Sequence, residues 1–126
     1  MKNVKLWLPV IIWCALIFFL SSIPDLGTGL GRWDFILRKI AHMAEYFILA
    51  LLIYRALKGS SNLTGFSLIA WTFIFSFLYA VSDEVHQFFV YGRSCEARDV
   101  LIDAAGIIIF CLLVKFNKKF SEKILF

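Results

Sequence analysis

Four long apolar runs constrain the fold of this chain more than any other feature. They extend over about residues 6–22, 37–57, 62–82 and 100–114. A helix that crosses a bilayer needs roughly 20 mostly apolar residues, so the first three runs are long enough to span. The fourth is long enough if Asp99 and Lys115 lie at the interfaces. The runs predict an all-α integral membrane bundle of four transmembrane helices, forming one domain over residues 1–126.

The composition excludes several other classes of protein. Hydrophobic residues make up 61% of the 126 residues and charged residues 17%, against roughly 45–50% and about 25% in soluble domains. Four spans leave no room for a soluble catalytic domain. The net charge of +4 does not indicate a nucleic-acid partner, because the basic residues are divided among segments separated by apolar runs. Cys14, Cys95 and Cys111 have the spacing of neither a disulfide framework nor a zinc ribbon.

The distribution of charge predicts the orientation. If the first helix begins inside, the inner side carries eight basic residues against the single acid Glu122, and the outer side carries five basic and six acidic residues. Cytoplasmic segments carry an excess of Lys and Arg. Both termini are therefore predicted to be cytoplasmic, with the longer loops at about 23–36 and 83–99 outside. Aromatic residues lie where an interfacial belt would place them: Trp33, Tyr46, Tyr79 and Tyr91 outside, Trp7 and Tyr54 inside.

A set of ionisable and amide residues remains that a simple membrane anchor would not carry. All map to the outer end of a helix or to the loop beside it: His42, Glu45, Asp83, Glu84, His86, Gln87, Arg93, Asp99 and Asp103. Lys39, His42 and Tyr46 share one helical stripe. Asp99 and Asp103 are stacked at i and i+4, and Gly106 continues their face and permits a close helix approach.

The cost of burying these groups predicts that they meet. A charged Asp near the bilayer centre costs about 2.5–3.5 kcal/mol on the insertion scale. Glu45 and Asp103 must therefore be protonated, paired or in contact with water. The sequence predicts one outward-opening polar pocket among the second, third and fourth helices.

Three interpretations of this pocket stay open on the residues alone. It is an ion-pair network that holds the helices in register, a binding site for a lipid-linked or cell-wall group, or a catalytic site. His and carboxylate side chains can supply acid, base or metal ligands. The candidate metal ligands are His42, Glu45, Glu84 and His86, although their spacing matches no known metal signature. These residues do not identify which cofactor the protein uses.

Several of these segments occur together in one known family. Residues 19–24, 39–46, 82–87, 92–93 and 98–106 resemble the motifs of the VanZ-like family, whose founding member is associated with resistance to the glycopeptide teicoplanin. The matches run through nearly the whole chain, in order and at the right spacing. Tyr91 stands where relatives often have proline, and Asp103 where many have asparagine.

The resemblance implies a small multi-pass protein of the bacterial plasma membrane, linked to envelope antibiotics. The expected partners are the lipid bilayer and a lipid-linked cell-wall precursor or a glycopeptide. An alternative is a membrane-embedded hydrolase or transferase acting on a lipid-linked substrate. In that alternative His42 or His86 is the general base and Arg93 holds an anionic head group.

Overall fold

Helices account for almost all of the chain that the computed structural model describes, which is residues 1–22, 32–89 and 97–124. The four long helices are α1 (Lys2–Ser22), α2 (Arg32–Ser60), α3 (Gly65–Phe88) and α4 (Ala97–Phe116). A short fifth helix, α5 (Lys118–Lys123), follows α4. The all-α prediction is confirmed. α1, α2 and α4 extend beyond their predicted apolar runs, whereas α3 begins at Gly65, inside its predicted run of 62–82, and ends beyond it. The short helix α5 was not predicted.

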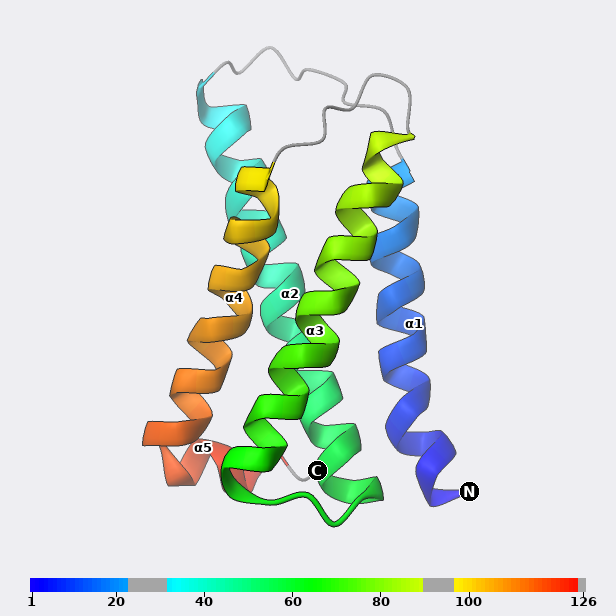
Figure 1. Ribbon diagram of the computed structural model, residues 1–126, viewed down its shortest axis with the longest axis vertical. Helices are drawn as coiled ribbons and strands as arrows, with labels where there is room; N and C mark the ends of the chain where they lie inside the picture. Colours follow the sequence, from blue (N-terminus) through cyan, green and yellow to red (C-terminus); the bar gives the residue numbers. More distant parts are fainter. Residues whose placement is uncertain (23–31, 90–96, 125–126) are drawn as a thin grey trace.

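The helices run alternately up and down, with α1 and α3 in one direction and α2 and α4 in the other (Figure 1). The N-terminal end of α1, the α2–α3 connection and α5 lie together at the lower end of the view. α2 packs against α1, α3 and α4, and α3 also contacts α1 and α4, whereas α1 and α4 do not touch within the described ranges. The core therefore forms around α2.

The core of the bundle consists mostly of apolar residues on α2 and α4. Leu49 and Ala50 of α2 and Ile107 and Phe110 of α4 are fully buried. Phe110 packs edge-on against Tyr54, with 5.6 Å between ring centroids. α4 has 20 residues, so at about 1.5 Å per residue it is roughly 30 Å long. It thus has the length of a bilayer's hydrocarbon core.

The exterior is apolar, and polar side chains are buried. Among the exposed side chains on α1 are Ile11, Ile12 and Phe19, while Asp83 and Asp103 are buried inside the bundle. Within the part of the chain that the structure describes, α1 and α3 are long and apolar enough to cross a membrane. Only 22% of the apolar window of each helix is buried, whereas a core helix of a soluble protein is mostly buried. The prediction that all four long helices span stays a prediction.

Candidate functional site

Polar side chains from all four long helices gather near the end of the bundle opposite α5. We call this group the polar layer. It comprises Ser21, Ser22, Lys39, His42, Tyr46, Asp83, Glu84, His86, Gln87, Asp99 and Asp103. Several members are almost completely inaccessible, with exposed fractions of 4% for Asp83, 2% for Gln87 and 1% for Asp103. Buried polar groups are normally paired, so their contacts determine what the layer can do.

A close approach of α2 and α4 forms one part of the polar layer. A Cβ on Gly106 would lie only 2.2 Å from the backbone oxygen of Met43, so no larger residue fits there without movement. The prediction that Gly106 permits close packing is confirmed. Beside this approach, Nδ1 of His42 lies 3.2 Å from Oδ1 of Asp103, and Nζ of Lys39 pairs with Asp99. Because α2 and α4 run in the same direction, the two pairs follow each other in the same order along both helices: Lys39 with Asp99, then His42 with Asp103.

A second part of the layer joins α3 to α2 and α1. The hydroxyl of Tyr46 donates to Oδ2 of Asp83 at 3.0 Å. Nε2 of Gln87 reaches the same carboxylate oxygen at 3.5 Å and Oγ of Ser21 at 3.4 Å. Asp83 and Gln87 are i and i+4 on α3 and therefore lie on one face. This chain of contacts links three helices through side chains alone.

His86 lies at the α1–α3 contact, apart from His42. Its ring stacks on Phe18, with 4.2 Å between centroids, and Nε2 is 2.9 Å from Oγ of Ser22. The Ser22 hydroxyl donates to the carbonyl of Phe18 at 2.8 Å. A hydroxyl has one proton, so it accepts from His86. The two imidazoles thus have different partners on different helix pairs.

One carboxylate oxygen in the layer is not satisfied. Oδ1 of Asp83 is buried, and it has no hydrogen-bond partner among the residues that the structure describes. An unpaired buried acceptor costs about 1–3 kcal/mol. Such a group in a native protein calls for an explanation, for example a water molecule or a ligand that supplies the missing donor. Oδ1 of Asp83 therefore has unused capacity to accept a hydrogen bond.

The proposed metal ligands do not form a cluster. Across the described ranges, no three His, Cys, Asp or Glu side chains are grouped so that they could hold a metal ion. His42 and His86 lie in the separate contacts described above, so the set of His42, Glu45, Glu84 and His86 provides no common coordination sphere. Glu84 is buried and Glu45 partly buried. Arg93 lies outside the described residues.

The sequence model of the VanZ/LLP1 family matches residues 6–118. The chain belongs to the VanZ/LLP1 family. No curated protein and no solved structure matches the chain.

In this VanZ/LLP1 chain, three of the quoted motifs meet in the polar layer. Residues 39–46 supply the α2 side of the layer, residues 82–87 the α3 side and residues 98–106 the α4 side. Of the side chains predicted to line an outward-opening pocket, His42 contacts Asp103 and Gln87 contacts Asp83, whereas His86 contacts Ser22 of α1. The outward-opening pocket itself stays a prediction.

Tyr46, Ser21 and Ser22 contribute to the polar layer, although the sequence did not predict them as site residues. The sequence predicts Tyr46 in an outer aromatic belt, but its exposed fraction is 0% and its hydroxyl donates to Asp83. Ser21 and Ser22 enter the sequence analysis only as part of a motif. The signal for Tyr46 was present, since it lies four residues after His42 on one helical stripe.

Proposed function

We propose that this VanZ/LLP1 protein is a multi-pass protein of the bacterial plasma membrane, with all four long helices crossing the bilayer. The apolar exterior of α1 and α3 supports this placement. Lys2, Lys5 and the lysines of α5 lie at the end away from the polar layer. By the positive-inside rule that end is cytoplasmic, and the polar layer lies in the outer half of the membrane.

We propose further that the polar layer binds the polar head of an envelope lipid or a cell-wall-linked group. The observation that carries the proposal is the buried Oδ1 of Asp83 without a partner. An acceptor in this state selects a ligand that brings a donor, such as a sugar hydroxyl, an amide N–H or an ammonium group. Lipid-linked cell-wall precursors carry such donors and are exposed on the outer face. Binding them there would alter how a glycopeptide such as teicoplanin engages the surface.

The competing interpretation is that the layer only holds the helices in register. The contacts between His42 and Asp103 and between Tyr46 and Asp83 suit that role. A layer that only holds the helices in register does not require an unpaired acceptor, however. A side chain without that buried oxygen would cost less free energy to bury. The two interpretations therefore differ in what they predict for Asp83.

The decisive variant is Asp83→Asn, compared with Ser82→Ala on the exposed side of the same turn. Asparagine retains an oxygen for Tyr46 and places an NH₂ donor where the ligand's donor would lie. We expect normal accumulation and thermal stability, with weakened binding of a purified lipid-linked cell-wall precursor in native mass spectrometry and increased teicoplanin sensitivity in cells. Ser82→Ala should behave as wild type.

Two further outcomes are informative. If Asp83→Asn, Glu84→Gln and Glu45→Gln all accumulate normally and keep wild-type binding and resistance, the polar layer is not the functional site. If Asp83→Asn instead fails to accumulate while Ser82→Ala accumulates, the register role is favoured over ligand binding.

A further inference from the structure

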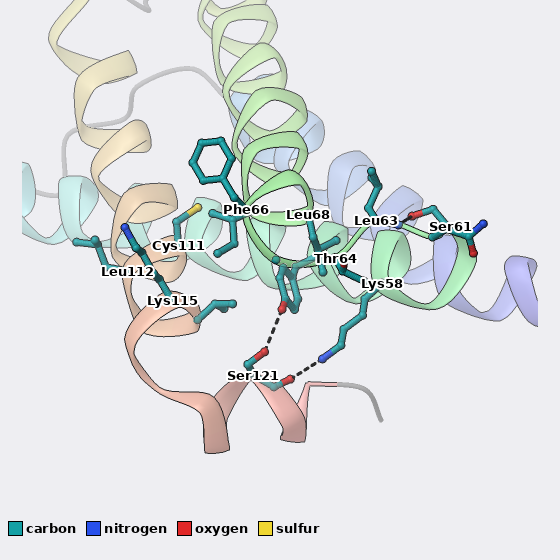
Figure 2. Close-up of a pocket in the computed structure, with 15 residues that line it drawn as sticks. Lys58, Ser61, Leu63, Thr64, Phe66, Leu68, Cys111, Leu112, Lys115 and Ser121 are labelled. Carbon is teal, nitrogen blue, oxygen red and sulfur yellow. Dashed lines mark hydrogen bonds between the residues drawn. The ribbon is translucent and has the colours of Figure 1, made fainter.

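A second site lies at the end of the bundle opposite the polar layer. A cavity of about 900 Å³ opens among the end of α2, the beginning of α3, the end of α4 and α5. Figure 2 shows the lining side chains, which come from all of these elements. Ligand pockets in proteins typically measure about 300–1,000 Å³. The cavity is therefore large enough for a lipid head group and the first part of its acyl chains.

The charged residues that line the cavity are both cationic. Lys58 and Lys115 line it, and no acidic residue is among the described residues that do so. The two ammonium groups point in different directions: Nζ of Lys58 faces Ser121, whereas Nζ of Lys115 lies 5.4 Å from the ring centroid of Phe116. Ser61, Asn62 and Thr64 add hydroxyl and amide groups to the lining. Lysine ammonium groups and neutral donors of this kind bind phosphate oxygens, so the lining complements an anion.

Lys58 is held in place rather than being free in solvent. Its Nζ donates to the carbonyl of Ser121 at 3.1 Å, as Figure 2 shows. Nζ also lies 5.6 Å from the ring centroid of Tyr54, whose hydroxyl is 3.0 Å from Oγ of Ser121. A side chain that is already ordered loses less conformational entropy when a ligand binds. Ser121 of α5 therefore positions the ammonium group of Lys58.

Most of the remaining lining is apolar. It includes Leu68, Ile69, Phe66 and Leu112 from α3 and α4. Leu68 is buried, whereas Phe66 and Leu112 are exposed on the outside of the bundle. The apolar part of the lining therefore reaches the apolar exterior, where the acyl chains of a bilayer would lie.

The beginning of α3 adds to the attraction for an anion. Thr64, which precedes the helix and lines the cavity, makes no capping hydrogen bond with its side chain. Gly65 has a φ of +58°, a conformation that favours glycine, and its Cβ position faces open space. The N-terminus of a helix carries partial positive charge and exposed N–H groups. The partial charge at the beginning of α3 adds to the attraction of the lysines for an anion and is smaller than their full charges.

We propose that this cavity binds one anionic phospholipid, with its phosphate facing Lys58, with Lys115 as the second cation of the lining, and with its acyl chains leaving along Phe66 and Leu112. A lining that combines lysines with apolar side chains selects a ligand that is both anionic and amphiphilic. Anionic lipids attract basic segments on the cytoplasmic face, by about fivefold for each Lys or Arg near the surface. The proposal uses the membrane placement given above and is independent of the ligand of the polar layer.

The test compares two variants that remove the same charge. In Lys58→Gln/Lys115→Gln both changes line the cavity, whereas in Lys118→Gln/Lys119→Gln both lie nearby on α5 and outside the lining. The purified full chain in detergent is titrated with phosphatidylglycerol or phosphatidylcholine, and bound lipid is counted by native mass spectrometry. We expect one phosphatidylglycerol per chain and at least about tenfold weaker binding by the cavity variant. The α5 variant should stay within about twofold of wild type.

Other outcomes would overturn the proposal. Equal losses in both variants would indicate a general basic surface, and equal binding of phosphatidylcholine would exclude selection by charge. Competition by inorganic phosphate at the same concentration as the lipid would indicate a soluble phosphate ligand. If the Lys58 change prevents folding, the test uses Lys115→Gln alone, because Lys115 is exposed. We then expect about fivefold weaker binding of phosphatidylglycerol.

The same titration separates this proposal from the function proposed for the polar layer. Asp83→Asn should bind phosphatidylglycerol as wild type does, and the cavity variant should retain binding of the cell-wall precursor. Loss of phosphatidylglycerol selectivity with precursor binding intact would overturn only the lipid site. Loss of precursor binding alone would leave the lipid site supported.

Discussion

The imidazole of His42 and the carboxylate of Asp103 contact each other across α2 and α4, with 3.2 Å between Nδ1 and Oδ1. The contact lies beside the point where Gly106 passes the backbone oxygen of Met43. The contact between His42 and Asp103 and the close approach therefore occur at the same part of the α2–α4 interface. A change at either position should alter the packing of α2 against α4.

Adding a methyl group at the close approach should destabilise the bundle. In Gly106→Ala the new Cβ would lie 2.2 Å from the Met43 oxygen, and overpacking of this kind typically costs about 1–3 kcal/mol. The control is Gly59→Ala, where the Cβ would meet the end of the Leu6 side chain at 2.6 Å, a group that can rotate away. Thermal unfolding in detergent should show a lower midpoint for Gly106→Ala only. Equal shifts would contradict the packing argument.

The contact between His42 and residue 103 should tolerate asparagine at position 103 but not leucine. Asp103→Asn retains an oxygen that accepts from His42, so we expect little change in unfolding free energy. Asp103→Leu leaves a polar imidazole without its partner and should cost about 1–3 kcal/mol. Replacing both residues in His42→Leu/Asp103→Leu should recover much of that loss, because the buried polar group is then removed. No recovery in denaturant titrations would show that the two residues act separately.

Removing the Tyr46 hydroxyl should weaken the contact between α2 and α3. In Tyr46→Phe, Oδ2 of Asp83 keeps only the 3.5 Å contact with Gln87, so we expect a loss of about 1–3 kcal/mol. A double-mutant cycle with Asp83→Leu should give a coupling of about 0.5–3 kcal/mol. The control is Tyr79→Phe, whose hydroxyl donates to the carbonyl of Cys14, and it should show no coupling to Asp83. Absence of coupling for Tyr46 would refute the link.

The proposed orientation predicts which positions react from outside intact cells. With the native cysteines replaced by alanine, Trp33→Cys at the beginning of α2 should react with a membrane-impermeant maleimide. Asn62→Cys in the α2–α3 connection should react only after the cells are opened. Both positions are exposed, so accessibility within the protein does not limit either reaction. The reverse pattern would invert the orientation, and labelling of both in intact cells would refute the multi-pass placement.

The sequence by itself determined the helical fold and which residues share a face. Apolar runs of spanning length predicted the four long helices, and the spacing of Asp99, Asp103 and Gly106 predicted one face of α4. These features are local, because helical periodicity relates residues within about two turns. The concentration of polar residues at one end of the bundle followed from the alternating direction of the helices.

Only the tertiary structure decided which neighbour each polar residue meets. It paired His42 with Asp103 and His86 with Ser22, separating two imidazoles that the sequence had grouped as metal ligands. It also buried Tyr46 against Asp83. Periodicity specifies the direction of a side chain relative to its own helix, whereas its partner depends on how neighbouring helices are rotated and how closely they pack. That information lies in contacts between residues far apart in the chain, so the pairings had to come from the assembled bundle.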